Sequence, residues 1–238
     1  MLPEANTYEE LVERFEWQIP ETFNIGSAIC DAWADCEQER EALIFIDEDR
    51  KAQSYSYGDL KRLSNQLASL FHSLELTQGD RVGVLLPQRP ETAFAHIAAL
   101  KSGAITIPLF TLFGDEALQY RLGNSGAKIV ITDAAGAEKI ERIRHELPDL
   151  ETVLCTDGSR FGALDLATEM EGQSEHFAPL ATKPDDPAII IYTSGTTGQP
   201  KGALHAHRVL LGHLPGVEMS HDFLGQPGDR IWTPADWA

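Results

Sequence analysis

A run of small hydroxyl-bearing residues and glycines lies near the carboxyl-terminal end of this 238-residue chain. Residues 192–202 read Tyr-Thr-Ser-Gly-Thr-Thr-Gly-Gln-Pro-Lys-Gly. Glycine lets the backbone approach an anion closely, exposed N–H groups form an anion-binding concavity, and hydroxyls donate hydrogen bonds. Lys201 adds a mobile positive charge that suits a phosphate group. These residue types in this order predict a phosphate-binding loop.

The phosphate loop, as we name it, comprises nine residues: Thr193, Ser194, Gly195, Thr196, Thr197, Gly198, Gln199, Pro200 and Lys201. The apolar residues 188–191 before it predict a buried strand, and residues 203–208 after it predict a helix whose N-terminus adds a favourable dipole. The loop is not a Walker A motif, because a proline separates its glycines from the lysine and no hydroxyl follows that lysine. The alternative is a flexible loop that happens to be rich in glycine and threonine.

Strands and helices alternate in the middle of the chain. We expect strands over 81–86, 104–108, 128–132 and 152–155, and helices over 90–101, 115–124 and 137–145. This alternation predicts an α/β fold, with mostly parallel sheets flanked by helices. Residues 158–187 are the least regular stretch and include a surface connection into the strand before the phosphate loop.

The first 80 residues predict smaller elements that precede this pattern. Thr7 and Glu10 have capping-box spacing and predict a short helix through Glu16. A second helix is expected over 24–36, and residues 42–47 and 54–57 are expected to pair as a hairpin. A longer helix begins at Ser56, since leucines and a phenylalanine recur at steps of three and four residues as far as residue 74.

Composition excludes several classes of partner. The formal net charge is −18, and residues 1–50 hold 14 acidic against three basic residues, so neither nucleic acid nor an anionic membrane is an expected partner. No apolar run is long enough to span a bilayer, and the first residues lack the features of a secretory or organellar address. Three cysteines without metal-type pairing suit a reducing compartment, so we expect a cytoplasmic protein.

Histidine and tryptophan near the end of the chain are weaker candidates for a site. His205, His207, His213 and His221 do not repeat at spacings of three or four, and no cysteine or acidic cluster completes a metal site, so no metal ligand is expected. His205 and His207 are expected on the helix after the phosphate loop. Trp232 and Trp237 are candidates for lining a ligand site, with ordinary aromatic packing as the alternative.

The phosphate loop resembles the signature loop of the acyl-adenylate-forming superfamily, which includes acyl-CoA synthetases, luciferases and the adenylation domains of peptide synthetases. Residues 55–60 and 100–109 resemble two further elements of that superfamily, with Asp59 where a glutamate is usual. Residues 110–114 and 232–238 are similar to short- and medium-chain acyl-CoA synthetases, including acetyl-CoA-synthetase-like members. The resemblance covers the chain from about Asn24 to its last residue.

This resemblance implies a reaction and its substrates. ATP binds with magnesium, the carboxylate of a small acid attacks the α-phosphorus, pyrophosphate leaves, and the acyl-adenylate reacts with the thiol of coenzyme A. The loop residues would hold the β- and γ-phosphates, and Lys201 would neutralise charge on the leaving pyrophosphate. No residue of this chain is named as a general base or nucleophile. The acid and the oligomeric state stay open.

The resemblance also implies an incomplete large N-terminal domain. We expect an N-terminal helical segment over 1–23 and an AMP-binding domain over 24–238 that is truncated at its carboxyl-terminal side, because the superfamily's later nucleotide motifs and its lid lysine have no counterpart here. The chain alone is then expected to be inactive. The alternatives are another adenylate-forming enzyme, such as a peptide-synthetase adenylation domain or an aryl-acid ligase, and a non-catalytic nucleotide- or pyrophosphate-binding fragment.

Overall fold

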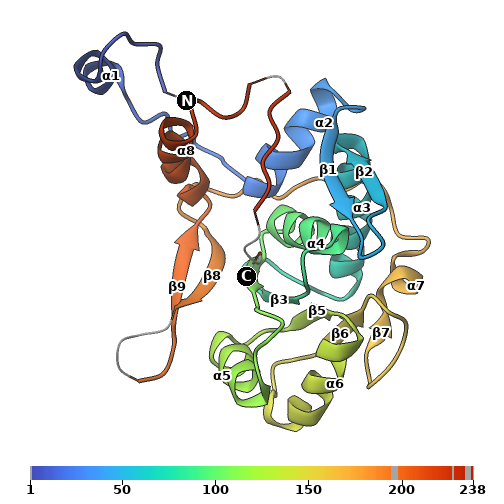
Figure 1. The fold of residues 1–238 in the computed structure, drawn as a ribbon. Coiled ribbons are helices and arrows are strands. Elements are labelled where there is room, and N and C mark those ends of the chain that lie inside the picture. Colours follow the sequence, from blue (N-terminus) through green and yellow to red (C-terminus); the bar gives the residue numbers. More distant parts are fainter. Residues whose placement is uncertain (1, 194–197, 227, 234–236, 238) are drawn as a thin grey trace.

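The computed structural model describes residues 2–193, 198–226, 228–233 and 237. Its centre is a seven-stranded sheet in the order β7-β6-β5-β3-β4-β8-β9 (Figure 1). The strands are β3 (Arg81–Leu85), β4 (Ile105–Pro108), β5 (Ile129–Thr132), β6 (Thr152–Cys155), β7 (Leu164–Asp165), β8 (Pro187–Thr193) and β9 (Lys201–Ala206). Neighbouring strands are parallel except β8 and β9, which form an antiparallel pair. The expected α/β fold is therefore confirmed.

Helices cover both faces of the sheet, as alternating strands and helices predict. The first face packs against α3 (Tyr57–Ser73), α4 (Pro90–Lys101) and α7 (Leu166–Met170), and its core includes Phe71 and Ile131, both fully buried. The opposite face packs against α5 (Asp115–Ser125) and α6 (Ala134–Ile143), where Leu118 and Val130 are fully buried. Successive side chains of a strand point to opposite faces, so β5 contributes to both cores.

The strand order places the carboxyl ends of the parallel strands at one edge of the sheet. β3 lies between β4 and β5, and β6 lies beyond β5, so the chain adds strands on both sides of its first one. Ligands of open α/β sheets bind beyond the carboxyl ends of the strands. β8 is parallel to β4, with Thr106 opposite Ile189. The segment that follows β8 is therefore at the edge where a ligand site is expected.

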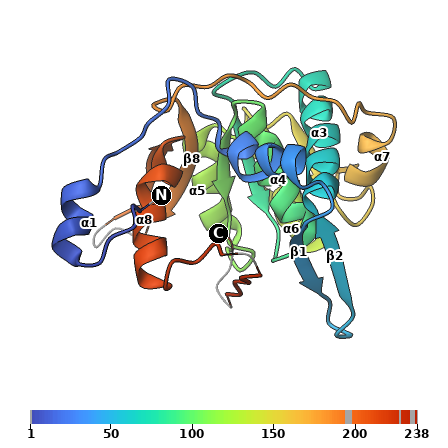
Figure 2. The same cartoon turned by 90° about the horizontal axis from the view of Figure 1, so that it is seen from above.

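The elements over residues 27–56 lie beside α3 and α4, whereas the first helix lies apart from them (Figure 2). The chain forms α1 (Tyr8–Arg14), a π-helical turn η1 (Ser27–Asp31), α2 (Ala32–Cys36) and a hairpin of β1 (Glu41–Ile46) with β2 (Ala52–Ser56). Ser56 begins α3 with a full capping box, since its side chain accepts from the Asp59 N–H and Asp59 accepts from its backbone N–H. The expected hairpin is present, as are the short first helix and the longer helix from Ser56, whereas the helix expected over 24–36 is divided into η1 and α2.

Asp133 moves the start of α6 to Ala134, three residues before the expected position. Its Oδ1 accepts a hydrogen bond of 2.8 Å from the Gly136 N–H and so caps the helix. A short 3₁₀ turn η2 (Arg144–Glu146) follows α6, and α8 (Val209–Ser220) is the last helix among the described residues. The stretch expected to be irregular contains the short elements β7 and α7.

A buried lysine joins the N-terminal elements to the sheet layer. Lys101 is fully buried, and its Nζ lies 2.5 Å from Asp31 Oδ1, 2.8 Å from Ser64 Oγ and 2.9 Å from Asn65 Oδ1. Breaking such a pair would leave a buried charge uncompensated, so the cluster fixes η1 against α3 and α4. Burial raises the pKa of the neighbouring Cys30 thiol to about 11, although the Lys101 ammonium opposes this effect. Cys30 therefore stays protonated.

Candidate functional site

The phosphate loop joins β8 to β9 and forms the end of their hairpin (Figure 1). Thr193 pairs with Lys201, and Tyr192 pairs with Gly202, so the two ends of the loop are held side by side by the ladder. Ser194, Gly195, Thr196 and Thr197 lie outside the described residues. The structure thus places five of the nine predicted residues: Thr193, Gly198, Gln199, Pro200 and Lys201.

The described residues of the phosphate loop are open to solvent. Thr193, Gln199 and Lys201 are exposed, and Pro200 is half-buried. Gly198 has φ +91° and no atom within 4 Å of the position where a Cβ would lie, so glycine meets a backbone requirement here. Within the described part of the chain, the Lys201 ammonium makes no hydrogen bond or ion pair. Its charge is therefore available to an anion.

The segment after the phosphate loop is a strand, so the predicted helix over 203–208 is wrong. β9 exposes its backbone polar groups to the free edge of β8, and pairing the two strands satisfies both sets of groups. The helix α8 begins only at Val209. A helix N-terminus therefore does not contribute its dipole to this loop, and His205 and His207 do not lie on a helix. His205 lies in β9 opposite Ile189.

His207 holds the base of the β8–β9 hairpin against the N-terminal elements. It is fully buried, and its Nδ1 accepts a hydrogen bond of 3.1 Å from the Ile25 N–H. The proton of the neutral ring is therefore on Nε2, which has no partner among the residues described. Burial lowers the pKa of His207, with the charge of Asp186 opposing. A neutral, enclosed imidazole of this kind acts as structural support for the hairpin.

Two tyrosines connect the hairpin to α5. The Tyr120 hydroxyl donates to the Pro200 carbonyl at 3.0 Å. The Tyr192 hydroxyl lies 2.7 Å from Asn124 Oδ1 and donates to the Arg121 carbonyl at 3.1 Å. The two rings meet edge to face, with centroids 6.3 Å apart. Sequence reasoning missed Tyr120, since nothing in its local pattern links it to a loop 80 residues later.

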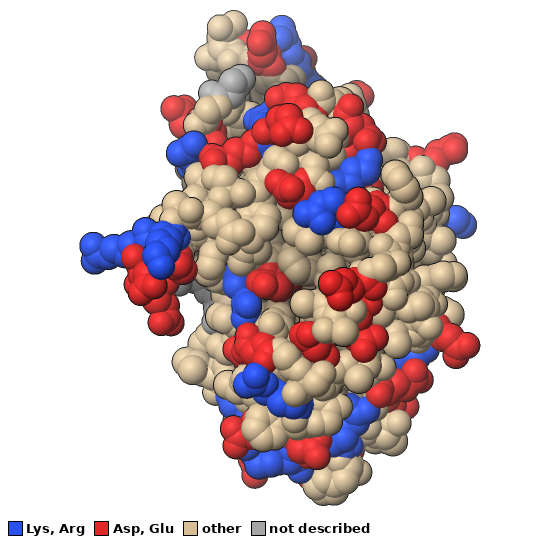
Figure 3. Space-filling model, turned by 90° about the vertical axis from the view of Figure 1, so that its right-hand side faces the viewer, with Lys and Arg blue, Asp and Glu red and all other residues tan. Residues whose placement is uncertain are grey.

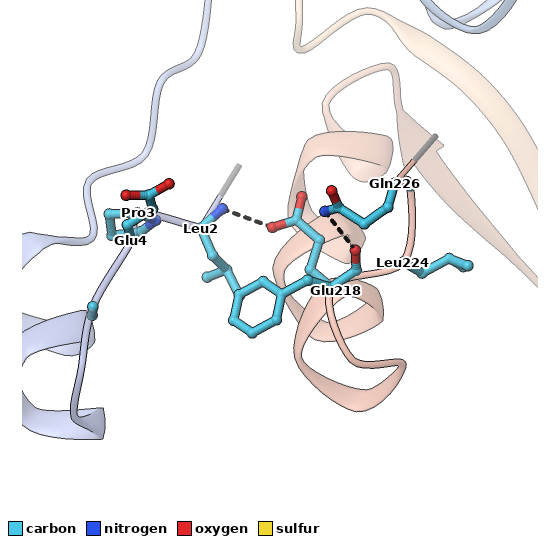
Figure 4. A pocket seen from close by; sticks show the side chains of 9 residues that line it. Leu2, Pro3, Glu4, Glu218, Leu224 and Gln226 are labelled. Atoms are coloured by element: carbon cyan, nitrogen blue, oxygen red, sulfur yellow. Dashed lines mark hydrogen bonds between the residues drawn. The ribbon is translucent and has the colours of Figure 1, made fainter. Parts of the chain in front are cut away.

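Two hollows on the surface of the described residues lie away from the described part of the phosphate loop. One of about 540 Å³ is lined by residues 2–5 and 223–226 together with Glu218, whose carboxylate accepts a 2.7 Å hydrogen bond from the Leu2 N–H (Figure 4). Another of about 330 Å³ is lined by Trp17, Ile19, Arg208, Leu211 and Gly212. Neither contains a phosphate-loop residue.

The charged side chains bear on two kinds of site, a metal centre and a site for an anionic ligand. Across the described residues, no group of three or more histidine, cysteine, aspartate or glutamate side chains is arranged to hold a metal ion. Acidic and basic side chains are interspersed on the face shown in Figure 3. The positive charge of Lys201 is therefore a local feature of a chain whose net charge is −18.

Comparison with known proteins establishes the family. The model of the AMP-binding enzyme family matches residues 30–238. The chain belongs to this family, and its phosphate loop lies within the matched region.

Curated relatives are acyl-CoA synthetases. Human acyl-coenzyme A synthetase ACSM1, mitochondrial, is 32% identical over 203 residues, which are 82% of this chain and 35% of the relative. Mouse ACSM3, mitochondrial, is also 32% identical and matches 98% of this chain and 42% of its own length. The acetyl-coenzyme A synthetase of Bacillus subtilis (strain 168) is 29% identical over 96% of this chain and 42% of its own. The chain thus spans about two fifths of the length of these relatives.

Solved structures show the same fold. The acyl-CoA synthetase of Brucella canis matches with a TM-score of 0.84 and 27% identity, over 98% of this chain and 43% of the other. The anthranilate CoA ligase AuaEII, in complex with anthranoyl-AMP, matches with a TM-score of 0.74 and 25% identity, over 84% of this chain and 38% of the other. The expected relationship to acyl-CoA synthetases is confirmed. In the described part of the chain, no helix has the length and apolarity needed to cross a membrane.

Proposed function

We propose that this chain supplies the phosphate-binding part of an ATP-dependent acyl-CoA synthetase that acts on a small or medium-sized carboxylic acid. The observation that carries the proposal is the phosphate loop at the carboxyl end of β8. Its Lys201 side chain is exposed, and the ammonium group has no polar partner among the described residues. The loop sequence and the acyl-CoA synthetases among the relatives support the same reaction.

The proposed chemistry depends on positioning and on charge. Loop N–H groups and hydroxyls hold the β- and γ-phosphates of ATP, and Lys201 neutralises charge that develops on the leaving pyrophosphate. Gly198 fits this task, because its positive φ and the open space around it leave the backbone accessible. Magnesium would enter with the nucleotide and screen the phosphate charge against an acidic protein. The substrate carboxylate then attacks the α-phosphorus and pyrophosphate leaves. The thiol of coenzyme A next takes the acyl group from the acyl-adenylate, and AMP is released.

Replacement of Lys201 tests the phosphate site. Lys201→Ala removes one charge-assisted contact, worth about 1.5–3 kcal/mol, so we expect about 10- to 150-fold weaker binding of magnesium pyrophosphate. Titration calorimetry on the 238-residue chain measures the affinity. Lys183→Ala is the matched control, since Lys183 is also an exposed lysine but lies outside the loop. Equal affinities of Lys201→Ala and the unaltered chain would remove Lys201 from the site.

A second candidate is another adenylate-forming enzyme, such as an aryl-acid ligase or a peptide-synthetase adenylation domain. The match to an anthranilate CoA ligase favours keeping it. A panel of fatty, aryl and amino acids, assayed for AMP release by the full-length enzyme with and without coenzyme A, separates these classes. Preference for an amino acid without a response to coenzyme A would contradict the acyl-CoA synthetase.

We further propose that these 238 residues do not catalyse acyl-CoA formation by themselves. The remaining alternative is a non-catalytic fragment that binds a nucleotide or pyrophosphate. Acyl-CoA formation by the isolated chain at the usual enzyme rate, about 1–1000 per second, would contradict this.

The division into a helical segment over 1–23 and an AMP-binding domain over 24–238 is also a proposal. Cooperative unfolding of residues 24–238 expressed without the first segment would support it. A cytoplasmic location is proposed as well, and cell fractionation tests it.

A further inference from the structure

A single tyrosine hydroxyl reaches the described end of the phosphate loop. Tyr120, on α5, donates to the Pro200 carbonyl at 3.0 Å. In the part of the chain that the structure describes, this is the one side-chain hydrogen bond to residues 198–201. The two residues are 80 positions apart, so the contact exists only because the fold brings α5 beside the hairpin.

The position of this hydrogen bond couples it to the lysine. Pro200 has no N–H, so its carbonyl is the backbone group through which the residue can be tied down. That carbonyl belongs to the peptide unit that joins Pro200 to Lys201. Because a peptide unit is planar, fixing the carbonyl also fixes the direction in which the chain enters Lys201. Lys201 is also held from the opposite strand, because it pairs with Thr193 in the β8–β9 ladder.

The helix that carries Tyr120 is itself firmly held. Leu118 and Leu122 of α5 are buried in the sheet core. Arg121 is only 8% exposed, and its guanidinium lies 3.9 Å from the centroid of the Phe113 ring. Tyr192 packs against Tyr120 and hydrogen-bonds Asn124 at 2.7 Å. The hydroxyl that holds the loop therefore projects from a packed element.

Helix α5 also carries a positive charge, the guanidinium of Arg121, which would attract an anion. Among the described residues, Arg121 forms no ion pair with a carboxylate, and burial lowers its pKa. The guanidinium donates to the Ala117 carbonyl at 2.8 Å and lies 5.7 Å from the centroid of the Tyr192 ring, so its charge adds positive potential to the hairpin. The helix thus brings both a hydroxyl tether and a positive charge to the hairpin.

We propose that Tyr120 is a positioning residue for the phosphate loop, holding the Pro200 carbonyl so that Lys201 is presented to the β- and γ-phosphates. This inference rests on the proposed function. The Tyr120 hydroxyl acts through Lys201 and does not itself contact the nucleotide. Its removal therefore weakens phosphate binding only while the lysine is present.

The test combines Tyr120→Phe with Lys201→Ala in a double-mutant cycle, with magnesium pyrophosphate as the probe in titration calorimetry. Tyr120→Phe removes one neutral hydrogen bond, so we expect roughly two- to twelve-fold weaker binding. In the Lys201→Ala background, the same change is expected to alter affinity less than two-fold, because two residues that act through one another are not additive. Tyr8→Phe is the matched control, since Tyr8 is 68% exposed on α1.

The possible results separate the positioning role of Tyr120 from the proposed function of the phosphate loop. Equal affinity of Tyr120→Phe and the unaltered chain, with a clear loss in Lys201→Ala, overturns the positioning role and leaves the proposed function standing. Additive losses in the double variant also overturn it, because they show that Tyr120 acts independently of Lys201. No binding of pyrophosphate by the unaltered chain overturns both proposals. A merely structural role of Tyr120 would lower the unfolding midpoint without producing the dependence on Lys201.

Discussion

The sheet layer and the outer elements of this protein differ in how they are packed. The sheet layer, β3 to β6 with α3 to α6, has a core on each face, and Phe71, Leu118 and Ile131 are fully buried. The outer elements are α1, the β8–β9 hairpin and α8. Helices α1 and α8 and strand β9 contain no buried residue, and β8 buries Ala188 alone. The difference shows that the phosphate loop is carried by the less packed region, which takes its position from the sheet layer.

A few hydrogen bonds hold the β8–β9 hairpin in place against the rest of the fold. His207 joins the base of the hairpin to the Ile25 N–H, and Tyr120 joins its other end to α5. The outer elements expose large apolar side chains, among them Tyr8, Val12, Ile191, Leu204, Val217 and Met219. Stability is therefore expected to come from the sheet layer, and binding from the outer hairpin. Three predictions probe this division, beginning with the largest effect.

Truncation of a core side chain should separate the two regions most clearly. Phe71→Ala creates a cavity in the sheet layer, so we expect the free energy of unfolding to fall by about 3–5 kcal/mol. Leu204→Ala on β9 is the matched change in the outer region, and it should stay within about 0.5 kcal/mol, because Leu204 is 57% exposed. Urea unfolding followed by circular dichroism measures both. Similar losses in the two variants would show that the hairpin shares the core.

Acid should destabilise both regions through buried histidines. Burial lowers the pKa of His96, which lies 2.6 Å from Thr106 Oγ1, to about 4 from an ordinary 6.5, and it also lowers that of His207. The unfolded chain therefore takes up protons at higher pH than the folded one. The free energy of unfolding is then at its full value above pH 6.5 and falls as the pH drops toward 4.

Histidine variants show which region responds to acid. Urea unfolding at several pH values from 8 to 4 is expected to give a shallower loss for His96→Gln than for the unaltered chain, and no change for His176→Gln, since His176 is exposed. Carboxylates such as Asp157, whose ordinary pKa of 3.8 is lowered mainly by the hydrogen bond from the Ala134 N–H, lose their contribution at lower pH. A pH-independent stability between 8 and 5 would contradict this prediction.

The smallest effect on stability is expected at Trp232. This side chain is 82% exposed, so Trp232→Ser should leave the free energy of unfolding within about 0.5 kcal/mol of its original value. Its exposed ring adds apolar surface that favours self-association, and the variant should associate less at high concentration. Light scattering over a concentration series measures the change. Loss of stability in the variant would show that Trp232 packs against the fold in solution.

Much of the sheet layer was determined by the sequence itself. Helix α4 runs from Pro90 to Lys101 as expected, because proline favours a first turn and the residues after it are rich in alanine, a strong helix former. The strand β6 likewise spans Thr152–Cys155 as predicted. The phosphate loop was identified from residue types alone, since glycine, hydroxyls and one lysine in a fixed order carry their chemistry without reference to distant residues.

Only the tertiary structure decided how that loop is held. Residues 203–206 include alanine and leucine, which favour a helix, but pairing with the free edge of β8 made the segment a strand. The buried pair of Lys101 with Asp31 and the contact of Tyr120 with Pro200 join residues 70 and 80 positions apart. Such contacts leave no periodic trace in the sequence, because they depend on which elements the sheet brings side by side. The sequence therefore specified the chemistry of the loop, and the packing of the sheet decided its orientation.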